Sequence, residues 1–331
     1  MKRVLVIVVT HNGMRWLSRC LGSVLGTVHE GPTDGPSRTL EVGCYVWDND
    51  STDGSADFVA AHFPQARLVR SADNLGFSRS NNMGVRYALE KGYDYVYLLN
   101  QDAWLEVGAL DKLVAFADTH PQYGVLSPLQ MTDGYMALDQ QFARIVGPGP
   151  ILSAGPGPRN MASSSVGGTS AGPGPGDKSG PGPRGDAVID VDRVMAAHWL
   201  VPTRVIREIG PLEEELFPHW GQDDEWCQIL HFCGYKVGVL PEARAVHDRA
   251  QRKDSTEVLV RRNYFTGSLL RLCDARYPLW LTFLYVILFT FVKAFKYRTL
   301  LPFKEFRHII SLLPKVRGRR SYVRMRARNA Q

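Results

Sequence analysis

Four short polar clusters contain the residue types that bind phosphorylated ligands. They lie at 10–12, 48–54, 74–84 and 100–102, and each is built from residues such as Asn, Asp, Ser, Thr and Gly. The cluster at 74–84 is a glycine-bearing turn that leads into a predicted helix, and a helix N-terminus suits a phosphate group. Each cluster taken alone has the composition of an ordinary turn. Their joint order along the chain is what indicates a site.

The elements that position these clusters alternate between strand and helix over residues 1–110. This alternation predicts a parallel α/β sheet. The predicted strands are 4–9, 42–47, 66–69 and 93–99, and the predicted helices are 16–28 and 81–90. Three of the clusters therefore begin where a strand ends. In open parallel sheets, ligands bind at that edge.

The bulk properties are those of a globular protein with an appendage. A chain of 331 residues can bury one large core, and 44% hydrophobic with 22% charged residues is ordinary. The five cysteines are an odd number without paired spacing, which favours a reducing compartment. Residues 147–185 repeat GPGP among Ser, Gly and Thr. We interpret them as a disordered insertion, because they contain almost nothing apolar to bury.

The C-terminal region combines an apolar segment with a basic tail. Residues 279–292 are apolar apart from two threonines and a tyrosine, and Lys293 and Lys296 follow them. Residues 315–328 then contain seven Lys or Arg and no acid. This pattern is typical of a helix that lies in the lipid interface, with cations on anionic headgroups. The alternatives are a buried helix with a solvated tail, or a tail that binds nucleic acid.

Taken in order, seven segments resemble the large inverting glycosyltransferase family of GT-A fold, which includes bacterial rhamnosyltransferases and galactofuranosyltransferases. The resemblance runs from residue 4 to about residue 270, interrupted mainly by the insertion. It implies an α/β GT-A fold, Rossmann-like with a mostly parallel sheet flanked by helices, as a domain over 1–272. Residues 273–331 then form a C-terminal apolar helical extension. The segments are VIVVTHNGMRWLSRCL, VWDNDSTDGS, DNLGFSRSNNMGV, YVYLLNQDAWLEVGAL, FPHWGQDDEWCQILHFCGYKV, LPEARAVHDRA and RRNYFTGSLLRL.

The resemblance implies a metal site. Breaking a sugar–diphosphate bond leaves charge on the phosphates, and a divalent cation such as Mg²⁺ or Mn²⁺ stabilises it. Asp102 matches the main protein ligand of the family, while Asn100 stands where many relatives have a first acid. His247 matches a late histidine that completes the metal site or contacts the diphosphate. The alternative for His247 is a structural role.

The resemblance also implies a general base. The Glu-Asp motif of the family aligns with Gln222 and Asp223, so Asp223 is the candidate that takes a proton from the acceptor hydroxyl. A shift of one or two residues would instead select Asp224 or Glu225. Acidic side chains are also favoured at solvated helix starts. The catalytic interpretation is favoured because two tryptophans flank the acids and provide apolar surface. The expected acceptor site consists of the neighbours of Asp223, namely Trp220, Asp224, Glu225 and Trp226.

Donor binding is assigned by the same resemblance. Thr10 and Asp48 are expected to bracket the nucleobase, and the Ala196–Ala197 pair lies where relatives usually have Gly-Ala beneath the donor sugar. Asn74, Arg79 and Asn82 are expected to face ribose or phosphate. The full predicted set is Thr10, Asn12, Asp48, Asn74, Gly76, Arg79, Asn82 and Asp102.

These features predict an enzyme that transfers a sugar from a nucleotide-diphosphate donor to a hydroxyl of a glycan or lipid-linked acceptor, in cell-surface polysaccharide synthesis. The expected location is the cytoplasm, at the inner face of the cell membrane, without nucleic acid as a partner. A non-catalytic GT-A-like scaffold is one alternative, suggested by Asn100 and Gln222. A nucleotidyltransferase is another, but THNGMRWL lacks its glycine- and arginine-rich phosphate signature.

Overall fold

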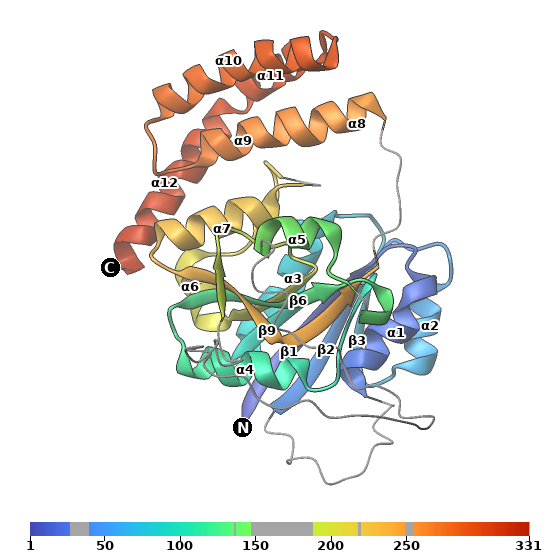
Figure 1. The fold of residues 1–331 in the computed structure, drawn as a ribbon. Coiled ribbons are helices and arrows are strands. Elements are labelled where there is room, and N and C mark those ends of the chain that lie inside the picture. Colours follow the sequence, from blue (N-terminus) through green and yellow to red (C-terminus); the bar gives the residue numbers. More distant parts are fainter. Residues whose placement is uncertain (27–39, 136, 147–187, 218–219, 249–254, 331) are drawn as a thin grey trace, which may run out of the picture.

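The computed structural model describes residues 1–26, 40–135, 137–146, 188–217, 220–248 and 255–330. Its centre is one nine-stranded sheet with the order β3-β2-β1-β4-β8-β6-β9-β5, and β7 pairs with β9 (Figure 1). The predicted insertion at 147–185 lies outside the described residues. The strands are β1 Lys2–Thr10, β2 Leu40–Asn49, β3 Arg67–Ser71, β4 Tyr95–Asn100, β5 Ala103–Leu105, β6 Tyr123–Met131, β7 Ile189–Val191, β8 His198–Pro202 and β9 Lys236–His247.

The first half of the sheet is parallel, as predicted from the alternating pattern. β1 pairs in parallel with both β2 and β4, and β2 pairs in parallel with β3. β8 then runs antiparallel to β4 and β6, while β9 is parallel to β6. Continuous apolar runs such as that of β1 are typical of strands that are covered on both faces. The carboxyl ends of β1, β2 and β4 consequently meet at one edge.

Helices cover both faces of the sheet. Alternate β1 residues belong to separate cores: Leu5 and Ile7 face one core, and Val4, Val6 and Val8 face the other. The helices are α1 Met14–Leu25, α2 Ser55–His62, α3 Phe77–Glu90, α4 Ala109–Thr119, η1 Asp133–Tyr135, α5 Gln140–Val146, α6 Thr203–Ile209, α7 Gln222–Phe232, α8 Thr256–Val260, η3 Arg261–Phe265, α9 Thr266–Cys273, α10 Leu279–Tyr297, α11 Leu301–Ser311 and α12 Leu313–Ala330.

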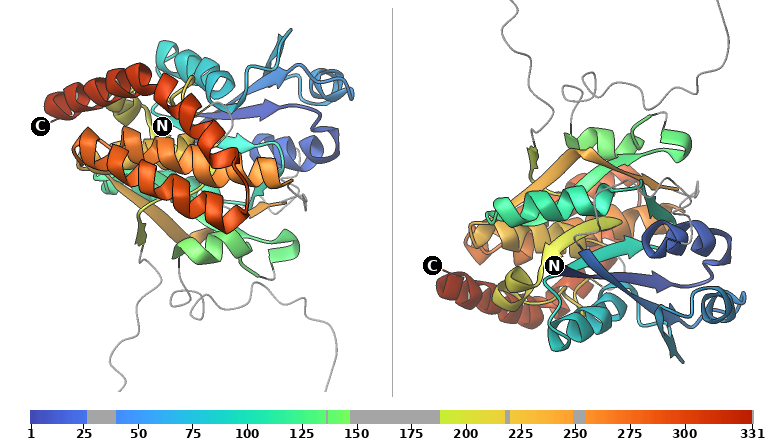
Figure 2. Two further views of the ribbon diagram at one scale, coloured as in Figure 1. Left: turned by 90° about the horizontal axis from the view of Figure 1, so that it is seen from above. Right: turned by 90° about the horizontal axis from the view of Figure 1, so that it is seen from below.

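The last helices form an additional layer over the α/β domain (Figure 2). A third apolar core joins Phe217, which precedes α7, to Leu269 on α9, Val286 on α10, Ile309 on α11 and Val316 on α12. From this layer α12 descends to α6 (Figure 1). The third core therefore contains residues of both the predicted domain, 1–272, and the predicted extension, 273–331.

The basic stretch at 315–328 is only partly exposed: Lys315, Arg317, Arg324 and Arg328 face solvent, whereas two arginines between them do not. Arg320 is 3% exposed and donates to the carbonyl oxygens of Leu272 and Asp274. Arg319 is also buried and pairs with Glu225 on α7. These arginines lie on a helix that packs against the domain, so burial and hydrogen bonding hold them inside.

Candidate active site

The ends of β1 and β2 bring two predicted donor residues together. Thr10 pairs with Asp48 across the parallel ladder, and both side chains are buried. Asp48 Oδ2 accepts from the backbone N–H of Ser51 at 3.3 Å. Asp48 Oδ1 is buried and has no hydrogen-bond partner among the described residues. A buried acceptor without a partner is costly in the free protein. This geometry fits an acceptor for the N–H of a ligand such as a nucleobase.

Gln101 joins the β1 loop to the β4 loop and was not predicted as a site residue. Its Oε1 accepts from Thr10 Oγ1 and from the His11 N–H, both at 2.9 Å. Gly13 makes this closure possible, because a Cβ on Gly13 would lie 2.3 Å from Gln101 Oε1. In the sequence, the position of Gln101 between Asn100 and Asp102 was the one indication of a role at the site. The hydrogen bonds of Gln101 stabilise the sheet edge where the donor is expected to bind.

Asn12 fixes the second turn in the same way. Its Oδ1 accepts from the backbone N–H of Thr52 at 2.9 Å, and its own N–H donates to Ser51 Oγ. Asn12 itself has a positive φ of 52°, a conformation that Asn tolerates better than most residues. Asn12 therefore shapes the loop around Asp48.

The turn at 74–84 is held onto the end of β2 by Asn49. Asn49 Nδ2 donates to Asn74 Oδ1 at 2.7 Å, and Asn49 Oδ1 accepts from the Leu75 N–H at 2.8 Å. Asn74 Oδ1 also accepts from the Gly76 N–H, which forms a local turn at the start of α3. Asn74 and Gly76 thus lie at the same sheet edge, but the Asn74 carbonyl oxygen is already bonded within the protein.

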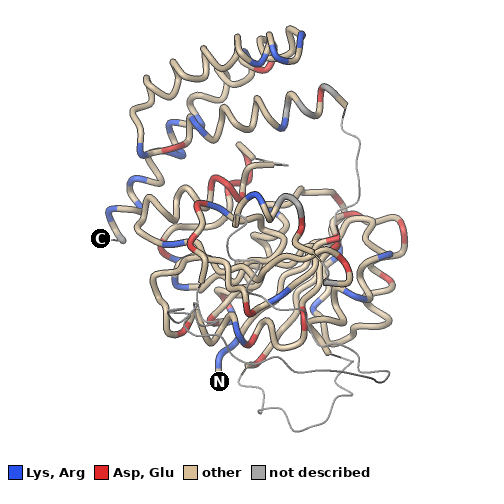
Figure 3. The backbone as a smooth tube through the Cα atoms, viewed as in Figure 1, with Lys and Arg blue, Asp and Glu red and all other residues tan. Residues whose placement is uncertain are grey.

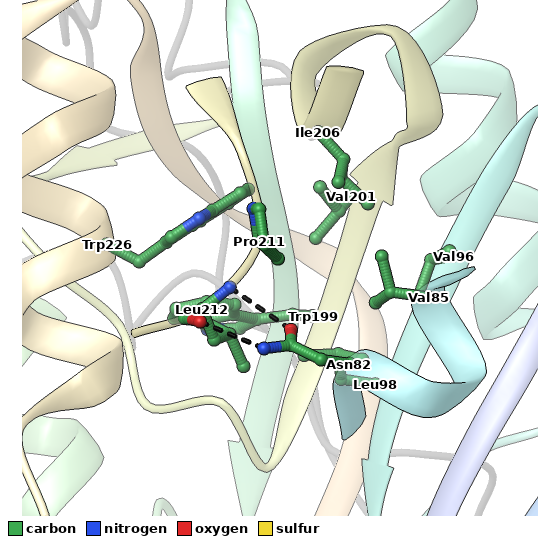
Figure 4. A pocket seen from close by; sticks show the side chains of 10 residues that line it. All are labelled: Asn82, Val85, Val96, Leu98, Trp199, Val201, Ile206, Pro211, Leu212 and Trp226. Carbon is green, nitrogen blue, oxygen red and sulfur yellow. Dashed lines mark hydrogen bonds between the residues drawn. The ribbon is translucent and has the colours of Figure 1, made fainter. Parts of the chain in front are cut away.

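Asn82 faces the protein interior rather than an open site. Its side chain is fully buried, donates to Leu212 O at 2.9 Å and accepts from the Leu212 N–H at 3.2 Å (Figure 4). It also donates to Glu214 Oε1 at 2.8 Å. Glu214 lies 3.8 Å from Arg79, whose side chain is 60% exposed. Both Arg79 and Asn82 were predicted to bind the donor. In the structure the Arg79 side chain is exposed to solvent, whereas the Asn82 side chain binds the backbone of the segment that follows α6.

Asp102 and His247 meet beside the sheet edge. His247 Nε2 lies 3.5 Å from Asp102 Oδ1, because β5 pairs with β9 and sets Ala103 opposite His247. His247 Nδ1 is buried and has no partner among the described residues. Those residues contain no group of three or more His, Cys, Asp or Glu side chains that could hold a metal ion. A carboxylate and an imidazole fit a cation that takes its other ligands from phosphate and water.

Asp223 lies in the first turn of α7, on the wall of a cavity of about 830 Å³. Burial, together with the neighbouring Asp224 carboxylate, raises the pKa of Asp223 to about 6. Asp224 pairs with Arg193 at 2.7 Å. The cavity is lined by Arg144, Ile145, Asp192, Arg193, Val194, Met195, Trp220, Gly221, Asp223, Asp224, Arg262, Asn263, Thr266, Gly267 and Leu270. A carboxyl group with such a pKa can accept a proton near neutral pH.

Glu225 and Trp226, which were predicted to belong to the acceptor site, point away from this cavity. Glu225 is 2% exposed and accepts two hydrogen bonds from Arg319, at 2.8 and 3.0 Å. Trp226 packs against Trp199 and donates to Gly210 O. Neither residue lines the cavity, whereas Trp220 does and is 40% exposed. A helix turns about 100° per residue, so adjacent acids necessarily face different surroundings.

The sheet edge and the cavity are connected through Ala196 and Ala197. The backbone N–H of Asn100, at the end of β4, donates to Ala197 O at 3.1 Å. The Ala196 backbone N–H in turn bonds the Asp223 carboxylate, which lowers its pKa and partly opposes the effect of burial. Ala196 and Ala197, which are adjacent in the chain, thus lie between the end of β4 and the carboxylate of Asp223.

Comparison with known proteins agrees with this arrangement. The family model described as glycosyl transferase family 2 matches residues 5–141. The N-terminal part of the chain is therefore similar to glycosyl transferase family 2. The predicted family and the predicted GT-A fold are confirmed. Asp102 lies inside the part of the chain that the family model matches, and Asp223 lies beyond it.

Two curated relatives and one solved structure are informative. The chain is 22% identical over 208 residues to the dTDP-rhamnosyl transferase RfbF of Shigella flexneri, covering 62% of this chain and 60% of that protein. It is 29% identical over 132 residues to an N-acetylglucosaminyl-diphospho-decaprenol L-rhamnosyltransferase of Mycobacterium tuberculosis. This match covers 38% of this chain and 40% of that protein. The structure of GalNAc-T7 with UDP, GalNAc and Mn²⁺ superposes with a TM-score of 0.52 at 14% identity, covering 84% of this chain and 52% of that one. The last likeness concerns the fold alone.

Proposed function

We propose that this protein transfers a sugar from a nucleotide-diphosphate donor to a hydroxyl group of an acceptor, with inversion at the anomeric carbon. The observation that carries the proposal is the position of Asp223. Its carboxyl group lies in the wall of a cavity of about 830 Å³ and has a pKa raised to about 6. Ala196 and Ala197 link this carboxyl group to the end of β4, which Asp102 follows. Family membership and two rhamnosyltransferase relatives support the same reaction class.

On the donor side, Asp48 Oδ1 accepts a hydrogen bond from the nucleobase, and Thr10 is locked beside it by Gln101. Asp102 and His247 hold Mg²⁺ or Mn²⁺ together with the donor diphosphate. The cation, when bound, stabilises negative charge on the leaving nucleoside diphosphate. Because the described residues would offer one carboxylate and one imidazole there, the affinity for metal depends on the donor being present.

On the acceptor side, Asp223 takes the proton of the attacking hydroxyl. A single displacement needs only this one base, and the hydroxyl then attacks from the face opposite the leaving diphosphate, which inverts the anomeric carbon. Asp224 is the weaker candidate for the base, because Arg193 already pairs with its carboxylate at 2.7 Å. Trp220 at the cavity wall supplies an apolar surface for the acceptor.

The cellular role follows from the relatives as part of the same proposal. One acts on a diphospho-decaprenol-linked sugar, and the other is a dTDP-rhamnosyl transferase. We infer a cell-surface polysaccharide pathway, a lipid-linked or glycan acceptor, and work at the cytoplasmic face of the membrane. A non-catalytic scaffold is the alternative in a different class of function.

The test uses the purified full chain with a panel of UDP-, dTDP- and GDP-sugars and Mn²⁺ or Mg²⁺. Release of nucleoside diphosphate is measured with and without a bacterial lipid extract as acceptor. We expect one donor to be consumed faster when the extract is present, and this consumption to stop in excess chelator. Binding of a nucleotide sugar without turnover of any donor would support the scaffold instead.

A further inference from the structure

Helix α10 turns its two threonines toward the protein and most of its large apolar side chains toward solvent. Thr282, Val286 and Thr290 recur every four residues and form its buried face. Thr290 Oγ1 lies 2.7 Å from Tyr264 OH and donates to Val286 O, so its hydroxyl is satisfied against the protein. A surface helix of a water-soluble domain normally shows the opposite arrangement.

The opposite face of α10 is a continuous apolar stripe, which we call the α10 stripe. Its members follow one another at helical spacing and are each at least 42% exposed: Trp280, Leu281, Leu284, Tyr285, Leu288, Phe291, Val292 and Phe295. Single exposed apolar residues are normal, but eight on one helix face mark a docking surface. In Figure 3 this helix is uncharged along most of its length.

The charged residues of α10 and of the turn that follows it are all basic. The sequence contains no Asp or Glu between Asp274 and Glu305. Lys296, Arg298 and Lys304 are exposed at the end of the stripe and at the turn that follows it. An apolar face followed by exposed cations complements an anionic lipid surface, where acyl chains and headgroups provide both partners.

In this fold α10 packs against α9, although it is the one helix in the described part of the chain that is long and apolar enough to cross a bilayer. A span would move its C-terminal end by about 28 Å, the length of 19 residues at 1.5 Å each. However, α12 returns to the start of α10, where Arg320 bonds the carbonyl oxygens of Leu272, Asp274 and Tyr277. Both ends of the α10–α11 hairpin therefore stay on one side.

We propose that α10 lies flat in the interface of an anionic membrane, with the α10 stripe in the acyl boundary and Lys296, Arg298 and Lys304 on the headgroups. The consequence for the acceptor rests on the proposed function. Thr266, Gly267 and Leu270 of α9 line the cavity that contains Asp223, and α9 packs directly against α10. Packed helix axes lie about 8–10 Å apart. The cavity is thus one helix layer from the lipid, within reach of an acceptor whose tail stays in the membrane.

The experiment measures sedimentation of the purified full chain with vesicles of phosphatidylcholine alone, or of phosphatidylcholine with phosphatidylglycerol. We expect binding to the anionic vesicles that weakens with salt. The double substitution Leu284→Glu with Leu288→Glu should reduce the partition coefficient by ~10²-fold or more, because it removes two large apolar contacts and adds two charges. Val107→Glu with Met325→Glu is the matched control, since both residues are exposed apolar side chains away from α10. Equal melting temperatures of the variants exclude misfolding.

Three outcomes would overturn the proposal. In the first, the wild type ignores both vesicle types. In the second, the Leu284/Leu288 variant binds as well as the wild type, or bound protein resists extraction at alkaline pH as a spanning protein does. In the third, the wild type dimerises without lipid and the variant is monomeric, which makes the face a protein interface. Donor turnover on a water-soluble acceptor, measured without vesicles, reports the proposed function separately from the docking.

Discussion

The substitution Arg319→Met tests how α12 is joined to α7, the helix that contains Asp223. Arg319 is 9% exposed, donates to both oxygens of Glu225, and lies 3.4 Å from Glu213. Methionine keeps much of the apolar stem but leaves Glu225, itself 2% exposed, without its cation. Removing one partner of a buried ion pair costs ~3–5 kcal/mol. We therefore expect the melting temperature to fall by roughly 5–15 °C at pH 8.

The pH dependence gives the sharper result. Burial raises the pKa of Glu225, and the Arg319 charge opposes this rise. Without the arginine, the pKa of the folded state rises further above the unfolded value. A carboxyl group with a raised folded pKa stabilises the protein when protonated, and this contribution is lost as the pH increases through that pKa. The difference in melting temperature between variant and wild type should therefore shrink as the pH is lowered from 8 to 5.

The assay is thermal unfolding of both proteins at several pH values. Lys315→Met is the matched control: both partners of its pairing with Glu215 are exposed, so its loss should leave the melting temperature nearly unchanged. Arg319→Met combined with Glu225→Gln should recover part of the loss, since no unpaired charge remains at position 225. The reasoning is refuted if Arg319→Met melts like the wild type, or if its deficit grows at low pH.

Three further predictions concern the proposed chemistry. Asp102→Ala should abolish transfer and metal-dependent stabilisation by nucleoside diphosphate while leaving the melting temperature of the free protein unchanged; full turnover in excess chelator would disprove a metal role. Gly13→Ala should weaken nucleotide binding by roughly 10-fold in calorimetry, because its Cβ would lie 2.3 Å from Gln101 Oε1; an unaltered Kd would show that the loops tolerate separation. The kcat/KM for transfer should rise with pH around a midpoint near 6, since Asp223 must be deprotonated to accept a proton; a flat profile between pH 5 and 8 would exclude it.

The sheet edge could be predicted because its signals are local. The apolar run of β1 and the polar residues after it indicate a buried strand and its carboxyl end, and the same holds for β2. Thr10 and Asp48 consequently lie side by side, as expected from parallel pairing. The strand ends differ from the prediction by a few residues: the second strand was predicted over 42–47, and β2 runs from Leu40 to Asn49.

Long-range pairing could not be predicted. Arg319 and Arg320 look like any other cations of a basic tail, and only the tertiary fold shows that one meets Glu225, 94 residues earlier. Asn82 lies in a segment that resembles a donor-binding element, but its amide is used by Leu212, 130 residues later. Both cases follow from one rule: a buried polar group must find a partner, and the partner can come from anywhere in the chain.

The side of α10 that faces the protein was also hidden in the sequence. Two threonines in an apolar segment look like interruptions of a hydrophobic helix. In the fold, Thr282 and Thr290 bond to backbone and side-chain oxygens on the inner face, which leaves the larger apolar side chains outside. The segment is thus packed in the fold on one face and exposed on the other.

The most direct test of the central claim is the rate of sugar transfer by Asp223→Asn under saturating donor and metal. The substitution keeps the shape and hydrogen-bonding reach of the side chain but removes proton acceptance. We predict a rate lower by ~10²-fold or more with unchanged donor affinity, and a smaller loss for Asp224→Asn, whose carboxylate is paired with Arg193. Transfer at the wild-type rate by Asp223→Asn would contradict the assignment of the base and, with it, the proposed mechanism.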